Sequence, residues 1–595
     1  MSIVHLVKVT AYGHRNRKEK TLEGMQEMGN LHLIPLNSQM DSVNSRGPSP
    51  QLRETLKFLL DCPQRRRQVR NPEKFDAADV EMRALKLKKQ ILVLEDERDF
   101  LRKRIQDLKP WGEFVFPSAS DLNDQRLWFY IVPHYKLPKV EQTDLKWQIV
   151  HKDNRFFYIV VLSENQPDGM PVARTATGKI PLSKLVERLD EVEIELEDLH
   201  LARVSLTRWC DLFAGNLRRL EDQEELIKAT RQTYDQSPLF ALQAWAPRKD
   251  IADLKRFAVK NQLALVVEEP KAVDVPPTLL HNPPVFSGGQ DLVSFYTTPS
   301  YWGWDPSITV FISFTVFFAM ILSDAGYALL LGFGLIASWR QMGRSEIGQR
   351  LRILFFSMVT ISFIWGACVG SYFGMQPQEG SVFATMNLLD LNDSETMMRL
   401  SILIGVSHVI LANFVDAWRL GRSTAAIAPI GWAVIILGAT TLWIGASGYG
   451  PAGSLKSTGI GAMGVGAVAI LLFTATSCTY GKRLLIGLQA LYKVTNAFGD
   501  ILSYLRLFAL GLASASLALA FNELAAQISA DVPGFGTLLA FIVLIVGHAL
   551  NLTLAIMSGF VHGLRLNFIE FFNWGLSDEG KPFRPFSKKD NYIWN

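Results

Sequence analysis

The chain has 595 residues, of which 48% are hydrophobic and 20% charged, and its formal net charge at pH 7 is +4. This length exceeds a single domain, and so small a net charge gives no reason to expect nucleic acid binding. Its four cysteines are far apart and form no CxxC pair, which argues against a disulfide framework and a zinc site. Charged, helix-forming sequence precedes Pro306 and long apolar runs follow it. We therefore expect a cytoplasmic arm at 1–300 and a membrane domain at 301–595.

The N-terminal segment has the pattern of an α/β unit. Residues 2–11 alternate apolar and polar side chains like a strand, 17–29 resemble a short amphipathic helix, and a second strand, LHLIPL, follows. The alternation lacks the apolar core of a cleavable signal peptide, so this half should stay in the cytoplasm. The polar stretch 38–76, rich in Ser, Pro and Arg, is expected to be a loop region interrupted by a helix at 51–61.

Two stretches, at about 76–108 and 181–232, repeat apolar residues every seven positions. Such heptads predict coiled-coil helices, and two of them in one chain favour an antiparallel hairpin. The insert at about 113–180 contains the strand-like runs LWFYIVP and FFYIVVLS, which predict a small α/β head at the hairpin's tip. After the second helix, strand, helix and strand signals predict another α/β head. On these residues alone, a generic coiled-coil spacer with interaction domains is the preferred explanation of the arm.

The C-terminal half contains eight apolar runs, which predict eight transmembrane helices after a Pro- and Gly-rich linker. The runs lie at about 306–322, 325–340, 351–374, 397–418, 425–447, 458–478, 484–528 and 534–572. The last two exceed the roughly 20 residues needed to span a bilayer, so they must tilt or extend beyond it. Basic residues concentrate in every second loop, and this positive-inside bias predicts that both termini are cytoplasmic.

Arg506 is the single arginine of the seventh run, and its hydrophobic stretch between Asp500 and Glu523 contains no acid. A guanidinium keeps its charge, and centring it in a bilayer costs about 2.5–3.5 kcal/mol, so the charge needs a use unless the side chain snorkels to the headgroups. Arg565 lies towards the end of the eighth run, and in a hairpin both arginines fall on one side of the membrane. At helical spacing, Ser503 and Ser514 lie on the same helix face as Arg506. The residues on the same face as Arg565 are His548, Asn551, Ser558 and His562. Two charged polar faces favour an ion pathway.

These segments resemble a known family. SYLRLFALGLA at 503–513, HGLRLNFIEFF at 562–572 and GKPFRPF at 580–586 are similar to the last two membrane helices of the I, or a, subunit of V/A-type rotary ATPases. The resemblance implies an α-helical membrane protein, with an eight-helix membrane domain and a cytoplasmic arm of coiled-coil hairpin and small α/β heads. It implies a non-catalytic stator subunit in a prokaryotic inner membrane, without a cofactor of its own.

The same resemblance implies partners and site residues. The partners are a rotating proteolipid (c/K) ring, peripheral stalk subunits bound by the arm, and a soluble ATPase sector reached through the stalks. Arg506 and Arg565 in helices 7 and 8 would act in ion translocation against a carboxylate on each ring subunit. The candidate channel lining is Ser503, Ser514, His548, Asn551, Ser558, His562 and Glu570. For each of these singly, an interhelical hydrogen bond is an equally good explanation.

The sequence departs from the eukaryotic pattern at two places. Those relatives have a His eight residues after the helix 7 arginine and a Glu ten before the helix 8 arginine, where this chain has Ser514 and Ala555. The choice between proton and sodium therefore stays open. Asp324, in a GDxGYG-like motif with Ser323 for the first Gly, is expected to be a turn acid facing the outer interface, and His408 and Asp416 to be packed or interfacial.

Two other classes of function compete. No GxxxxGK[ST] motif occurs, so we expect ATP chemistry only in partner subunits. A secondary transporter with a cytoplasmic coiled-coil regulatory arm would need a midplane site and broken helices in both halves, and no matching pair of segments is evident. A membrane receptor with a coiled-coil stalk would leave the two arginines without a use.

Overall fold

The computed structural model describes residues 2–37, 50–117, 122, 125–378, 380–389, 393–447, 452–476, 478–576 and 578–588. The loop predicted over 38–76 lies partly outside these residues, because 38–49 are not described. The chain divides into two compact units. One comprises Met1–Arg17, Met28–Leu36 and Asp235–Phe586, and the other Lys18–Glu27, Asn37–Tyr234 and Ser587–Asn595.

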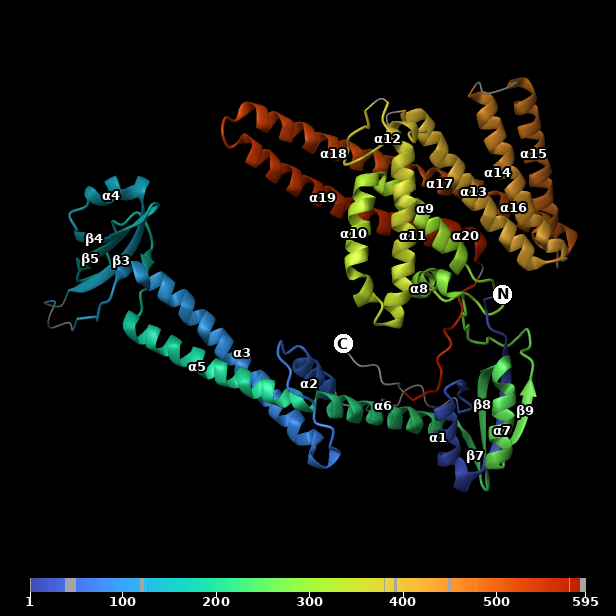
Figure 1. Ribbon diagram of the computed structural model, residues 1–595, viewed down its shortest axis with the longest axis horizontal. Coiled ribbons are helices and arrows are strands. Elements are labelled where there is room, and N and C mark those ends of the chain that lie inside the picture. The colour runs from blue at the N-terminus through green and yellow to red at the C-terminus, as the bar shows by residue number, and fades with distance from the viewer. Residues whose placement is uncertain are drawn as a thin grey trace. The chain divides into compact units, whose positions relative to one another are not determined.

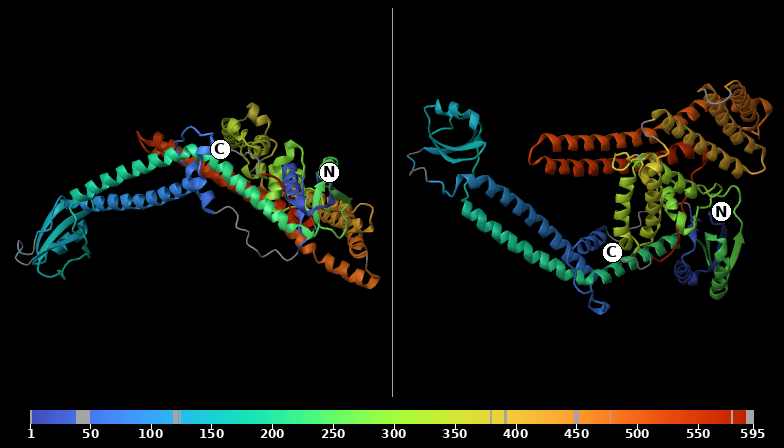
Figure 2. Two further views of the ribbon diagram at one scale, coloured as in Figure 1. Left: turned by 90° about the horizontal axis from the view of Figure 1, so that it is seen from below. Right: turned by 45° about the horizontal axis from the view of Figure 1, so that its top comes forward.

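Long helices dominate the second unit. Helix α3 (Ala77–Leu108) and helix α5 (Leu182–Leu206) lie side by side in Figures 1 and 2, and Ile91, Leu101, Val192 and Leu196 are buried in the seam. A 3-10 turn at Thr207–Trp209 divides α5 from α6 (Cys210–Gln232), so the second heptad stretch is two helices rather than one. Helix α2 (Pro50–Leu60) packs against α3 and α6, and α1 spans Lys18–Met28. The supercoiling of α3 and α5 stays a prediction.

The insert between these helices folds into an antiparallel sheet in the order β4-β5-β3-β6. Its core is Tyr130, Val132, Ile159 and Val161, closed by Val140 from a short helix. The alternating residues of LWFYIVP and FFYIVVLS therefore place one face of each strand in a core, as strand periodicity requires. The elements are β3 (Arg126–Pro133), α4 (Leu137–Glu141), β4 (Lys146–Lys152), β5 (Phe156–Ser163) and β6 (Arg174–Thr175).

The first unit begins with a sheet that joins distant parts of the sequence. Strand β1 (Leu6–His14) pairs antiparallel with both β8 (Leu239–Pro247) and β9 (Ala264–Glu268), and β2 (His32–Ile34) pairs with β8. The two strand-containing regions predicted separately therefore share one sheet. The short β7 (Tyr234–Gln236) also pairs with β8, and α7 spans Ile251–Asn261.

The rest of the first unit is helical, and its length and hydropathy identify an integral membrane protein. Within the described residues, six helical segments are long and apolar enough to cross a membrane: Glu346–Val369, Ser394–Leu420, Thr424–Ala446, Gly453–Phe473, Tyr480–Asp531 and Gly536–Gly575. Helix α9 (Ser307–Leu322) is apolar but has 16 residues, about 24 Å at 1.5 Å per residue, and is almost entirely buried among its neighbours. Helix α10 (Ala325–Met342) carries Arg340 in its last turn. The prediction of eight spans thus stays a prediction.

The remaining helices of this unit are α8 (Ser287–Tyr296), α11 (Glu346–Val369), α12 (Val382–Thr385), α13 (Ser394–Leu420), α14 (Ile427–Ala446) and α15 (Ala452–Phe473). The seventh apolar run is not one helix, because turns divide it into α16 (Tyr480–Leu491), α17 (Val494–Leu502) and α18 (Leu505–Asp531). Helix α19 (Gly536–Arg565) returns beside α18 as a hairpin (Figures 1 and 2). A π-helix (Leu566–Phe571) and α20 (Phe572–Gly575) complete the eighth run.

Candidate functional site

Arg506 lies in the first turn of α18, immediately after the break at Ser503 and Tyr504. Its Nη1 atom is buried and has no hydrogen-bond partner in the described part of the chain. Arg565 and Glu570 both lie within electrostatic range of the guanidinium. The hairpin thus brings the two predicted arginines and one carboxylate together.

The π-helix explains how Glu570 reaches this position. Residues five apart in an α-helix lie about 140° apart around the axis, whereas the i→i+5 hydrogen bonds of a π-helix bring them onto one face. Arg565 and Glu570 are five apart, and Arg565 Nε lies 3.8 Å from Glu570 Oε1. The side chain of Glu570 is 3% exposed and that of Arg565 50% exposed. The carboxylate is therefore buried while the guanidinium stays accessible from outside.

Within the described segments, three buried polar atoms at this place have no hydrogen-bond partner: Nη1 of Arg506, Nδ1 of His562 and Oε2 of Glu570. Ser503 lies beside the Glu570 carboxylate. Leaving a buried polar group unpaired costs about 1–3 kcal/mol, so three such atoms in one cluster indicate a place for water or another molecule. Two arginines face one acid, and the surplus positive charge can receive an anionic group. We call Arg506, His562, Arg565 and Glu570 the arginine cluster.

The break before α18 is held by α13. Tyr504 is fully buried, and its hydroxyl lies 2.8 Å from Nδ1 of His408. His408 stacks on Phe571 with ring centroids 4.3 Å apart, so the same side chain contacts both the break before α18 and the π-helix. His408 is packed, as predicted, and Asp416 pairs with Arg419 at 2.8 Å.

Three of the other predicted lining residues, Ser514, His548 and Asn551, form a second group. Ser514 and Asn551 are buried, and hydrogen bonds connect them with His548 and with Tyr327 of α10. Ser558 lies on α19 between the two groups in sequence and belongs to neither. Tyr327 was missed by the sequence reasoning. Its position in the GDxGYG-like motif was the only available signal.

The expectation that Asp324 faces the outer interface is wrong. Asp324 is 2% exposed and caps the N-terminus of α10. Its carboxylate accepts hydrogen bonds from the backbone N–H groups of Tyr327, Phe373 and Gly374 and from the Ser371 hydroxyl, at 2.8–3.0 Å. A carboxylate with four donors is stable in a buried turn, and a helix N-terminus favours a negative charge.

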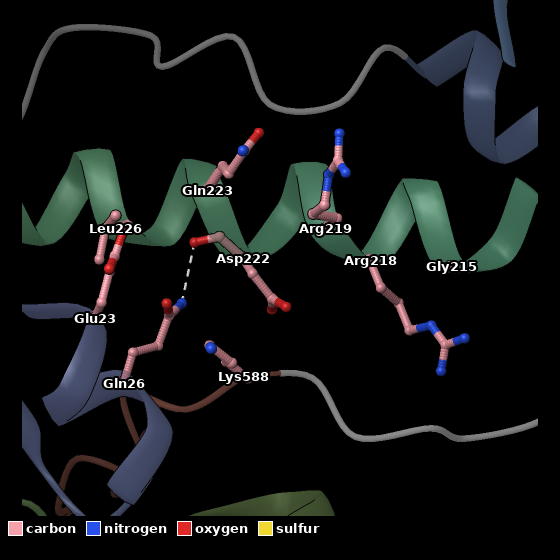
Figure 3. Close-up of a pocket in the computed structure, with 9 residues that line it drawn as sticks. All are labelled: Glu23, Gln26, Gly215, Arg218, Arg219, Asp222, Gln223, Leu226 and Lys588. Atoms are coloured by element: carbon pink, nitrogen blue, oxygen red, sulfur yellow. Dashed lines mark hydrogen bonds between the residues drawn. The ribbon is translucent and has the colours of Figure 1, made fainter. Parts of the chain in front are cut away.

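A separate cavity of about 400 Å³ lies in the other unit, beside α1 and α6 (Figure 3). Gln26 Nε2 donates to the backbone oxygen of Asp222 at 3.0 Å, and the Lys588 side chain points towards the same space. A hydrogen-bonded ion pair of Lys588 with Glu27, at 2.6 Å, raises the pKa of Lys588 and lowers that of Glu27. Acids and bases alternate around this cavity, which does not favour one class of ligand. In the described ranges, no group of three His, Cys, Asp or Glu residues could hold a metal ion.

Comparison with known proteins places these features in context. No protein-family model matches the chain. The sequence is 26% identical to the V-type ATP synthase subunit I of Chlamydia pneumoniae, over 90% of this chain and 88% of that protein. It is 25% identical to the V-type ATP synthase subunit I of Chlamydia muridarum, over 96% and 97%. It is 27% identical to the A-type ATP synthase subunit I of Pyrococcus abyssi, over 69% of this chain and 63% of that protein.

Among solved structures, the chain matches the crystal structure of the cytoplasmic N-terminal domain of subunit I, homolog of subunit a, of V-ATPase. The match covers 44% of this chain and 99% of that one, with 17% identity. Its TM-score of 0.22 is too low to infer a common arrangement of the elements.

Proposed function

We propose that the chain is a subunit I of a V-type or A-type ATP synthase, like the relatives it resembles, and that it is the non-catalytic membrane stator of such a complex. In this role it forms the ion half-channels against a rotating proteolipid ring, and its arm anchors the peripheral stalks. The observation that carries the proposal is the arginine cluster, with its surplus positive charge and unpaired buried atoms. ATP chemistry belongs to partner subunits.

The cluster acts on a carboxylate of the ring. An opposite charge within about 4–6 Å lowers the pKa of a carboxylate by roughly 1–3 units, so a ring carboxylate facing Arg506 releases its ion. The same carboxylate facing lipid must be neutral or ion-loaded, because a bare charge there is costly. Arg506 cannot give up its own proton and blocks a direct leak between the two half-channels. The accessible Arg565 shares the electrostatic role, and Glu570 and His562 border the path.

The proposal includes an orientation in the membrane. In this proposal the chain has eight spans and both termini lie in the cytoplasm of a prokaryotic cell, where the arm meets the stalks. The basic residues in every second loop support this orientation. A secondary transporter is not favoured, because the relatives are subunits of ATP synthases.

Affinity purification of the full-length chain from its native membranes tests this function. Small proteolipids, stalk subunits and a soluble ATPase should co-purify in fixed ratio with the chain. Recovery of the chain alone, from membranes in which an assembled V- or A-type ATPase is detected by its activity, would contradict the proposal.

A further inference from the structure

Tyr327 of α10 joins three of the predicted lining residues into one hydrogen-bonded group. Its hydroxyl lies 2.7 Å from Nδ1 of His548 and accepts from Nδ2 of Asn551 at 3.0 Å. The same Asn551 nitrogen donates to the backbone oxygen of Ser514 at 2.8 Å, and the Ser514 hydroxyl lies 3.4 Å from Asn551 Oδ1. We call Tyr327, Ser514, His548 and Asn551 the Tyr327 node. It connects α10, α18 and α19.

The hydrogen bonds of the node assign one state to the imidazole of His548. Its Nε2 lies 3.0 Å from Oδ1 of Asn522, whose Nδ2 donates to the backbone oxygen of Phe373 at 2.8 Å. An amide oxygen only accepts, so Nε2 of His548 donates. In the neutral ring Nδ1 then accepts, and the Tyr327 hydroxyl donates to it. Every donor in this chain of contacts meets an acceptor.

This arrangement does not suit proton transfer through the side chains. A proton moves along hydrogen bonds only through groups that can both take up and release one. The hydrogen bonds of His548 and Tyr327 end at two amides: Oδ1 of Asn522 accepts from His548, and Nδ2 of Asn551 donates to Tyr327. An amide neither takes up nor releases a proton near neutral pH. Among the side chains that the structure describes, a proton placed on His548 therefore has no hydrogen-bonded route to the arginine cluster.

The node has a rigid base. The buried Asp324 carboxylate accepts from the backbone N–H of Tyr327 and from those of Phe373 and Gly374. Phe373 in turn accepts from Asn522 of α18. The start of α10 and the loop after α11 are thus fixed to each other. Through Asn522 they contact α18, and through Tyr327 they contact α19.

We propose that Tyr327 is a positioning residue that sets the rotation of α18 and α19 about their axes, and so the direction in which Arg506 and Arg565 face the ring. Ser514 lies eight residues after Arg506, about 12 Å along the helix, and Asn551 fourteen before Arg565, about 21 Å. When hydrogen bonds hold one residue of a stiff helix in place, the helix cannot rotate about its axis, and the directions of its other side chains are fixed. His548, Asn551 and Ser514 then brace the hairpin instead of carrying the ion. This inference rests on the proposed function.

Three variants of the full chain, assembled in its complex in membrane vesicles, test the inference by ATP-driven ion uptake per ATP hydrolysed. His548→Gln can keep both hydrogen bonds, because an amide accepts and donates, but it cannot take up a proton. We expect it to retain native uptake and the native pH profile. His548→Ala and Tyr327→Phe leave polar groups unpaired and should each lower the uptake ratio by about five-fold or more. Ser338→Ala, on α10 but outside the node, is the control and should change nothing, because the Ser338 hydroxyl donates to backbone oxygens of its own helix.

Two results would overturn the inference. If His548→Gln loses uptake as completely as His548→Ala, or shifts the pH profile, His548 carries the ion and does not merely position the helices. If Tyr327→Phe and His548→Ala both keep the native ratio, the node positions nothing that uptake needs. The proposed function fails in a different way, since the native chain would then support no uptake at all.

Discussion

At the scale of single residues, the charge balance of the arginine cluster decides what the site can bind. Glu570 lies 3.8 Å from Arg565 and is buried, so it offsets part of the positive charge without cancelling it. Arg506 keeps an unpaired Nη1 atom. A ring carboxylate would interact with the remaining positive charge. This charge must be strong enough to attract the carboxylate and weak enough to let it leave.

Replacing Glu570 by Gln tests this balance. Without the acid, the two arginines should hold a ring carboxylate in its ionised form more strongly, and reloading of the ion should slow. A charge removed within about 4–6 Å shifts a carboxylate pKa by roughly 1–3 units, so maximal ATP-driven uptake should fall about ten-fold or more. Assembly should be unaffected. Glu346→Gln, which neutralises an exposed carboxylate at the start of α11, is the control, and equal uptake by both variants would contradict the account.

The sequence revealed these charged residues more readily than their neutral partners. Arg506 and Arg565 stand out because an arginine in an apolar run needs an explanation. Tyr327 does not stand out, because a tyrosine is common in an apolar helix and its hydrogen bonds come from helices far away in sequence. Asp324 was misplaced for a related reason. An acid in a turn is usually exposed, and the four donors that bury this one become visible only in three dimensions.

At the scale of elements, close packing of α18 on α9 places Arg506. A Cβ atom at Gly511 would lie 2.6 Å from the backbone oxygen of Met320 and 2.8 Å from Oγ of Ser323. Only glycine therefore permits the approach of α18 to the end of α9. Gly511 lies just over one turn beyond Arg506, so a displacement there moves the arginine.

Gly511→Ala should separate the two helices. Overpacking of this kind typically costs about 1–3 kcal/mol, so we expect a lower midpoint of thermal unfolding for the solubilised complex and reduced uptake. Gly461→Ala in α15 is the matched control, because no atom lies within 4 Å of its added Cβ. Equal unfolding midpoints for the two variants would show that α18 does not depend on this approach.

Helix boundaries were harder to predict than helix existence. The apolar runs at 484–528 and 534–572 predict single helices, because hydrophobic residues continue through each run. At the break at Ser503–Tyr504, Tyr504 contacts His408 of a distant helix, and local sequence does not report this contact. The π-helix also lacks a sequence signal, although it brings Glu570 to Arg565.

At the scale of the whole first unit, backbone hydrogen bonds tie the C-terminal segment to its sheet and linker. Thr278 donates to the oxygen of Lys581 at 2.7 Å, and Phe586 donates to that of Leu31 at 2.6 Å. The N–H of Arg584 donates to Nδ1 of His32 at 2.9 Å. The segment directly follows α20, so it connects the last membrane helix with strand β2. Side-chain alternation predicted the strands. It did not predict this connection, because the C-terminal segment is held by backbone hydrogen bonds, which do not depend on a pattern of side chains.

His32 makes this connection sensitive to pH. Burial, with the nearby charges of Arg584 and Lys581, lowers the pKa of His32 below its usual value of about 6.5. The folded state therefore binds fewer protons at His32 than the unfolded state, and stability falls as the pH drops below about 6.5. We expect the unfolding midpoint to decrease between pH 7.5 and 5.5. His32→Asn keeps an acceptor for Arg584 but does not titrate, so it should show a smaller decrease, and an identical decrease would exclude His32 as the cause.

The most direct test of the central claim is ATP-driven ion uptake by membrane vesicles carrying the native chain or Arg506→Lys, with assembly checked on the same membranes. Lysine keeps a positive charge but loses the planar guanidinium and can release its proton. Arg344→Lys, in the loop between α10 and α11, is the control and should behave as the native chain. The account predicts that Arg506→Lys assembles but loses uptake. Unchanged uptake in an assembled Arg506→Lys complex would show that Arg506 only snorkels to the membrane surface, and would contradict the account.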